Sequence, residues 1–278
     1  MPGGTGGGRG ARMGRGSRLT IAAALAACVA IAIAAPANAL MLISRKTEVS
    51  IGKQVQQEII DEYGGLSADA ALNERVQRIG ASVAAVSPRK DVTYTYQVVN
   101  SQVINAFSAP GGPVLITQKL AGMMTTDDEL AFVLSHETGH IAAQHARDLI
   151  NRSLIAQGLA TVLFGGASAA VQNGVNVAYT LHDRGYSRNQ EYQADDYGVK
   201  LMQQAGYSPE GAVKALARLG MDTSKGLNKY LATHPDVPRR IDRVGKIAGI
   251  SADRQQELIK EAQAEIAGSR QGSSDPAK

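Results

Sequence analysis

Two histidines and a glutamate near the middle of the chain have a spacing that suits metal-assisted hydrolysis. His136 and His140 are four residues apart, and Glu137 directly follows the first histidine. On a helix this spacing puts both imidazoles on one face, about one turn apart, where they can chelate a single zinc ion. Glu137 is rotated by about 100° from His136, so it can act as a base toward a water on the metal without ligating the metal.

The residues that flank this motif favour a buried metal site over a polar helix surface. Leu130, Val133, Leu134 and Ile141 surround the motif, so both histidines would be buried polar groups. Such groups are costly unless they bind a ligand or form hydrogen bonds. The pattern therefore predicts that the imidazoles are metal ligands.

A catalytic zinc site needs a third protein ligand and one open position. The segment YSRNQEYQAD, residues 186–195, contains two acidic candidates. On a helix, Glu191 and Asp195 share a face, so Glu191 can bind the metal while Asp195 accepts from the distal N–H of one histidine. We therefore predict one zinc ion per chain, with His136, His140 and Glu191 as its ligands and Asp195 as a supporting residue.

The elements that must position these side chains are mostly helical. Apolar residues recur at helical spacing in several stretches. Thr126 and Glu129 form a capping box, which predicts the start of the helix that carries HETGH. The predicted helices cover residues 48–63, 69–86, 126–150, 208–220 and a stretch after 251.

Alternating apolar residues predict three short strands, over 92–98, 103–107 and 114–117. Pro110-Gly111-Gly112-Pro113 is the turn between the last two. The sequence thus predicts a predominantly helical α+β fold, with a small, mostly antiparallel sheet beside the helix of His136.

The first 39 residues are typical of an export signal. They contain four arginines, no acidic residue, an apolar run over 19–35 and a small-residue cleavage site that ends at Ala39. We expect cleavage after Ala39 and a periplasmic or cell-envelope location. The alternatives are retention as a membrane anchor, or a lipoprotein anchored through the only cysteine, Cys28, because Leu25-Ala26-Ala27-Cys28 has the form of a lipoprotein processing site.

Charge gives no case for nucleic acid or an anionic membrane surface as a partner. Four of the 29 basic residues lie in the signal, which leaves 25 basic and 25 acidic residues in the remainder. We expect a metallopeptidase domain over 40–267 and a disordered tail over 268–278. Segment 153–181 has no charged residue, but its glycine, asparagine and glutamine residues favour a buried or lid-forming helical pair over a membrane span.

A series of short motifs extends the pattern over residues 48–243. The motifs are Asn105-Ala106-Phe107, Pro110-Gly111-Gly112, Glu129-Leu130-Ala131, HETGH, Ser187-Arg188-Asn189-Gln190-Glu191 with Ala194-Asp195, and His234-Pro235 with Arg240. This series resembles the HtpX-like and CAAX-prenyl-endopeptidase family of zinc metallopeptidases, and within that family the soluble periplasmic branch. The resemblance implies a gluzincin fold with His136, His140 and Glu191 as zinc ligands.

The resemblance also implies a role for the proline-bracketed loop around His234. It implies that the loop aims His234 at the zinc site and that Arg240 helps to fix the loop. Two roles for His234 stay open, a hydrogen bond to the oxyanion or occupation of the open metal position. We expect substrate to lie extended along the strand that begins with Asn105, Ala106 and Phe107, pairing with a sheet edge.

The predicted function is that of a zinc-dependent endopeptidase acting on unfolded or misassembled envelope proteins. The alternative is a holdase-like binding protein with a structural metal and incidental cleavage, although a purely structural site has no use for Glu137. His145 lies five residues after His140, and Ala143 replaces the glycine of metzincins. We therefore expect His145 to form a structural hydrogen bond and not to bind the metal.

Overall fold

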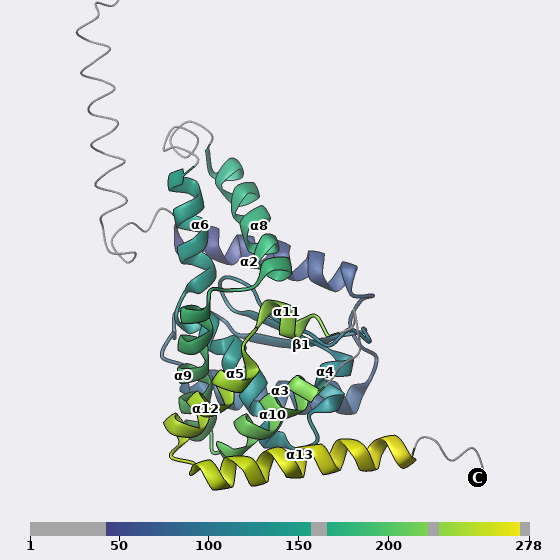
Figure 1. Ribbon diagram of the computed structural model, residues 1–278. Coiled ribbons are helices and arrows are strands. Elements are labelled where there is room, and N and C mark those ends of the chain that lie inside the picture. Colours follow the sequence, from purple (N-terminus) through teal and green to yellow (C-terminus); the bar gives the residue numbers. More distant parts are fainter. Residues whose placement is uncertain (1–42, 157–165, 222–227, 273–278) are drawn as a thin grey trace, which may run out of the picture. The chain divides into compact units, whose positions relative to one another are not determined.

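The computed structural model describes residues 43–156, 166–221 and 228–272, so the predicted signal segment and Cys28 lie outside the described residues (Figure 1). Helices dominate, around a three-stranded sheet of β1 (Thr95–Val99), β2 (Ala106–Ser108) and β3 (Pro113–Thr117). The helices are α2 (Arg45–Glu62), α3 (Ala70–Val86), α4 (Gln118–Met123), α5 (Asp127–Ala142), α6 (His145–Ala156), α8 (Gly166–Arg184), α9 (Arg188–Gln204), α10 (Glu210–Met221), α11 (Tyr230–Thr233), α12 (Val237–Ala248) and α13 (Ala252–Gly272).

The sheet is mixed, whereas the alternating sequence predicts a mostly antiparallel one. Its strand order is β1-β3-β2, with β2 antiparallel and β1 parallel to β3. β3 is buried along its whole length, and its Val114-Leu115-Ile116 run is apolar without alternation, as suits a central strand covered on both faces. The loop between β1 and β2 carries the chain past the position that β3 fills, so β1 and β3 run in the same direction.

A glycine turn closes the hairpin between β2 and β3. Gly111 and Gly112 have φ angles of 79° and 130°, which L side chains rarely adopt. A Cβ on Gly112 would also lie 2.2 Å from the carbonyl oxygen of Thr93. Glycine at this turn therefore lets the hairpin approach the segment that leads into β1.

α5 is the central helix, and it is shorter than its sequence predicts. Thr126 accepts from the backbone N–H of Glu129, as the capping box predicts, but the Glu129 carboxylate accepts from Thr125 and not from the cap itself. The helix ends at Ala142 instead of continuing to residue 150. Gln144 has a φ of 59°, a left-handed conformation that interrupts the helix, and α6 begins directly after it.

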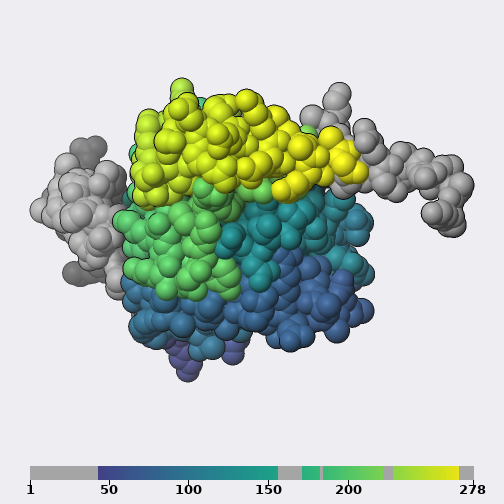
Figure 2. Space-filling model, turned by 90° about the horizontal axis from the view of Figure 1, so that it is seen from below, coloured from purple at the N-terminus to yellow at the C-terminus, as the bar shows by residue number. Residues whose placement is uncertain are grey.

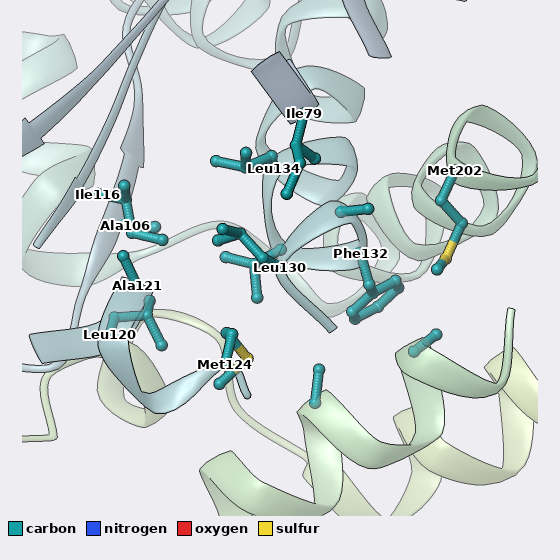
Figure 3. Packing of buried hydrophobic residues seen from close by; sticks show 14 of the residues in the cluster. Ile79, Ala106, Ile116, Leu120, Ala121, Met124, Leu130, Phe132, Leu134 and Met202 are labelled. Atoms are coloured by element: carbon teal, nitrogen blue, oxygen red, sulfur yellow. The ribbon is translucent and has the colours of Figure 1, made fainter. Parts of the chain in front are cut away.

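The main core forms around α5. Leu130, Phe132 and Leu134 are fully buried and lie among side chains from the sheet and from neighbouring helices, including Ile116 and Met202 (Figure 3). A helix that is buried around its whole circumference must carry its polar residues in a packed interior. His136, Glu137 and their neighbours on α5 are therefore held by the core itself.

Two helices at the C-terminal end complete this core. Figure 2 shows α13, in yellow, lying along the green segment that includes α10, and the two helices pack together. Arg218 of α10 links them to α5 through Glu129 and Glu265, at 3.0 and 2.5 Å. α13 continues to Gly272, past residue 268, where the composition predicts the start of a disordered tail.

A second core lies between α2, α8 and the outer face of β2. Ile51, Val55, Ile59, Phe107 and Ala178 are buried there, and α8 packs on both α2 and α6. Among the described residues, no helix is both long and apolar enough to span a membrane. Of the uncharged segment 153–181, the structure describes the last four residues of α6 and most of α8, and 157–165 lies outside the described residues.

Candidate metal centre

The central helix α5 buries three polar side chains side by side. His136, Glu137 and His140 are each at most 1% exposed. One turn separates the two imidazoles, whose ring centroids are 4.8 Å apart. Their burial removes water as a partner, so the protein or a ligand must satisfy them.

α9 brings two carboxylates to the same place. Small residues let α9 approach α5 closely, since a Cβ on Gly139 would lie 3.0 Å from the Ala194 carbonyl oxygen and one on Gly198 would lie 3.4 Å from the His136 backbone nitrogen. Glu191 and Asp195, one turn apart on α9, are buried at this contact. Close helix packing therefore positions both acids against the histidines of α5.

Four side chains converge on one point. Ligand atoms of His136, His140, Glu191 and His234 all lie within 4.8 Å of one another. Nε2 of His136 and Nε2 of His140 are 3.5 and 3.4 Å from the two oxygens of Glu191, and 3.2 Å from each other. This group combines the predicted ligands with His234.

Asp195 lies behind the cluster, next to His136. Its Oδ1 is 3.0 Å from Nδ1 of His136, and an ionised carboxylate can only accept. Nδ1 of His136 therefore donates, so Nε2 is the nitrogen that faces the cluster and can bind a metal ion. Burial raises the pKa of Asp195, but the charge of Arg240 and the hydrogen bonds outweigh it and hold the pKa at about 2.

Arg240 anchors this arrangement from α12. Its guanidinium is fully buried and donates from Nε and Nη2 to the two oxygens of Asp195, at 2.9 and 2.8 Å. Its Nη1 donates to the backbone oxygen of His234 at 3.3 Å. Arg240 therefore contacts both the supporting acid and the loop of His234.

His234 lies inside the site. Its Nδ1 is 2.9 Å from Oε2 of Glu191, and its Nε2 is 3.6 Å from Oε1 of Glu137. Tyr230 stacks on its ring at a centroid distance of 4.3 Å. The turn after it depends on Asp236, which has a φ of 70°. The loop thus directs the imidazole between the two glutamates.

The donor chemistry fits a divalent cation. Oε1 of Glu137 and Oε1 of Glu191 are buried without a hydrogen-bond partner among the described residues, and a buried unpaired carboxylate oxygen is strongly disfavoured. Burial and Arg240 lower the pKa of His136, but Asp195 and Glu191 outweigh them and raise it to about 9. The carboxylates therefore favour a positive charge here, and a nitrogen and oxygen donor set suits zinc.

An open pocket of ≈ 400 Å³, counted with its solvent-filled mouth, adjoins the site. Glu137, Tyr186 and His234 line this pocket, together with Ala106 and Phe107 of β2. Asn105 is not among the lining residues. It is fully buried, and its side chain accepts from the backbone N–H of Ala106 instead.

β2 is an edge strand whose outer edge is partly open. The N–H of Thr117 donates to Asn105, and that of Ala109 donates to Pro113, so residues 106 and 108 turn their peptide groups outward. Farther along, the oxygen of Ile104 accepts from the N–H of Tyr230 at 3.0 Å. The segment of Tyr230 therefore occupies the outer edge at Ile104, but it does not cover the edge of β2 beside the pocket.

Two side chains that support His140 and its neighbour His145, namely Tyr186 and Gln193, have no clear signal in the sequence. Tyr186 stacks on the His140 ring at a centroid distance of 3.9 Å. His145, expected to form a structural hydrogen bond, contacts Nδ1 of His140 with its own Nδ1 at 2.9 Å and reaches Gln193 with Nε2 at 3.0 Å. A lone tyrosine or glutamine has no characteristic spacing, so only the fold identifies these contacts.

Comparison with known proteins agrees with this geometry. The sequence profile of peptidase family M48 matches residues 70–248. The mitochondrial metalloendopeptidase OMA1 of Schizosaccharomyces pombe is 30% identical over 212 residues, 73% of this chain and 61% of that protein. Metalloprotease LoiP of Escherichia coli is 29% identical over 156 residues, covering 54% and 60% of the two chains.

The matches cover only part of the relatives' own lengths. The beta-barrel assembly-enhancing protease of Escherichia coli is 25% identical over 235 residues, 77% of this chain but 48% of that protein. The matches to the OMA1 proteins span between 32% and 63% of their lengths. The family match, however, takes in both histidines of α5, Glu191 and His234, so the chain belongs to peptidase family M48.

Proposed function

We propose that this chain is a zinc-dependent endopeptidase that cleaves unfolded or misassembled proteins of the cell envelope. The observation that carries the proposal is the convergence of His136, His140 and Glu191 beside Glu137, at the wall of an open pocket. Two imidazoles and one carboxylate would hold the ion. The set leaves a further position for water or substrate, which His234 adjoins.

In the proposed hydrolysis, the metal activates the carbonyl and the water, and Glu137 transfers the proton. When bound, the metal ion polarises the scissile carbonyl and makes an attacking water more acidic. Glu137 takes a proton from that water as its oxygen adds to the carbonyl carbon, and delivers the proton to the amine nitrogen as the C–N bond breaks. Glu137 lines the pocket and its Oε1 has no hydrogen-bond partner among the described residues, so the carboxylate is suited to both transfers.

Substrate selection would depend on the backbone more than on side chains. The N–H of Ala106 is taken by the Asn105 side chain, so an extended segment can pair with the outward carbonyl of Ala106 and the outward peptide groups of Ser108 on β2, next to the pocket. Unfolded chains offer such segments, whereas folded proteins bury them. This supports unfolded protein substrates.

An envelope location is supported by the export-type first 39 residues and by the name of one relative, a beta-barrel assembly-enhancing protease. We propose cleavage after Ala39 and a periplasmic product. Anchoring through an acylated Cys28 is the alternative, and mass spectrometry of the mature N-terminus distinguishes the two.

The function is tested with unfolded casein, with and without a chelator of divalent metals. Fragments that appear only with metal support the endopeptidase. Suppression of casein aggregation without cleavage, unchanged by the chelator, would instead support the holdase-like alternative.

Replacing Glu191 by alanine is expected to weaken zinc binding by more than roughly 100-fold, because the loss of a direct ligand exceeds the 10–100-fold that the loss of a supporting residue costs. Metal content after dialysis and chelator competition measure it. Glu210→Ala, which removes a partly exposed first-turn glutamate from α10, is the control. Stoichiometric zinc in the Glu191 variant would place the third ligand elsewhere.

Replacing Asp195 by asparagine is expected to weaken zinc binding or activity by roughly 10–100-fold. Asparagine cannot accept both guanidinium bonds of Arg240 and also hold the N–H of His136, so the imidazole loses its fixed orientation. Asp196→Asn, which alters the neighbouring partly exposed carboxylate paired with Arg243, is the control. Equal zinc affinity in both variants would show that Asp195 does not support the metal site.

A further inference from the structure

His136 and His140 present the same nitrogen to the cluster, but only His136 has a carboxylate behind it. Behind His140 lies another imidazole, that of His145, with a distance of 2.9 Å between the two Nδ1 atoms. His145 is 3% exposed, so water has little access to this contact. One of the two nitrogens must donate and the other accept.

The second contact of His145 decides the direction. Nε2 of His145 lies 3.0 Å from Oε1 of Gln193 on α9, an oxygen that can only accept. Nε2 of His145 therefore carries the hydrogen, and in the neutral ring Nδ1 has the lone pair. Nδ1 of His140 then donates to it, which leaves the Nε2 lone pair of His140 directed at Glu191 and His136.

The break between α5 and α6 makes the contact. In a continuous helix, residue 145 would be rotated by about 140° from residue 140 and would face away from it. The left-handed Gln144, with a φ of 59°, ends α5 and turns His145 back toward His140. A non-glycine residue in this conformation is a form of strain that often accompanies a functional site.

We propose that His145 is a positioning residue for the metal centre, which fixes the tautomer of His140 while Gln193 orients His145. The inference rests on the proposed zinc site. Each α5 histidine then donates its Nδ1 hydrogen to an acceptor. For His136 the acceptor is the carboxylate of Asp195, and for His140 it is the imidazole of His145, which Gln193 orients. Because Gln193 is exposed, its loss matters less than the loss of His145.

The test measures zinc affinity by chelator competition on the purified chain. His145→Phe removes the acceptor but keeps a ring, and is expected to weaken zinc binding by roughly 10–100-fold. His145→Asn restores an acceptor, since Oδ1 of asparagine lies where Nδ1 of histidine lies, and is expected to bind zinc within about threefold of the unaltered chain. A merely structural role would weaken both variants alike.

A second pair keeps the test valid if His145→Phe does not fold. Gln193→Leu is expected to weaken zinc binding by roughly tenfold, whereas Gln203→Leu, the same change at another exposed position of α9, is expected to have no effect. Two-bond ¹H–¹⁵N spectra of the imidazoles, recorded without metal, are expected to show hydrogen on Nδ1 of His140 and on Nε2 of His145.

The outcomes separate the two proposals. An unaltered chain that binds no zinc overturns the proposed function. An unaltered chain that binds zinc, combined with unchanged affinity in His145→Phe, equal weakening in Phe and Asn, or the opposite His145 tautomer, overturns only the positioning role of His145.

Discussion

Replacing Glu137 by glutamine is expected to lower turnover by roughly 100- to 10,000-fold, the range that a positioned general base contributes, while zinc stays bound. Glutamine has nearly the same shape but cannot take a proton from water. The residue is not among the four side chains whose ligand atoms converge, so the metal keeps its donors. The rate of casein cleavage measures the loss of turnover, and the zinc content of the same sample measures whether the metal stays bound.

A matched change elsewhere isolates the effect of position. Glu58→Gln alters an exposed glutamate of α2 and is expected to change neither turnover nor zinc. Hydrolysis by Glu137→Gln at the rate of the unaltered chain would refute the mechanism. Loss of zinc from that variant would instead show that Glu137 contributes to holding the metal. An inactive variant that still binds substrate also serves to capture the natural substrates.

The parts of the site that follow from local spacing are predictable from sequence. The i, i+4 pairs on α5 and α9 each place two side chains on one helix face, and a capping box marks where α5 begins. Burial of His136 and His140 follows from their apolar neighbours. These features depend on residues within a turn or two of each other, which a sequence displays directly.

Other features depend on contacts that spacing does not encode. The break before His145 requires a left-handed glutamine, and Gln144 has no feature that distinguishes it from a helical glutamine. The parallel pairing of β1 with β3 depends on which strand is central, a choice made by packing on both faces of the sheet. Asn105 likewise forms part of a plausible strand, but packing turns its side chain inward, where it accepts from the backbone N–H of Ala106.

Replacing His234 by alanine separates two roles whose expected effects differ by about a thousandfold. If the imidazole donates to the oxyanion, its loss is expected to slow turnover by roughly 100-fold or more. If it occupies the open metal position in the resting enzyme, its loss is expected to raise basal activity. The contacts support occupation, because Nδ1 of His234 lies 3.3 Å from Nε2 of His136 and 2.9 Å from Oε2 of Glu191.

The size of the increase follows from how firmly the loop is held. Arg240 bonds the backbone oxygen of His234, and Tyr230 stacks on its ring. If these contacts favour the closed arrangement by about 1.4 kcal/mol, only about one molecule in ten is competent, and removal of the imidazole raises the basal rate about tenfold. Initial rates of casein cleavage at equal zinc occupancy measure the effect.

Leu231→Ala is the control, since it loosens the same loop through a partly buried side chain without removing the imidazole. Acceleration by His234→Ala beyond that of Leu231→Ala supports occupation of the metal position by His234. A fall of roughly 100-fold in His234→Ala alone would assign the oxyanion role instead. Equal rates in both variants and the unaltered chain would mean that His234 lies beside the metal without acting on it.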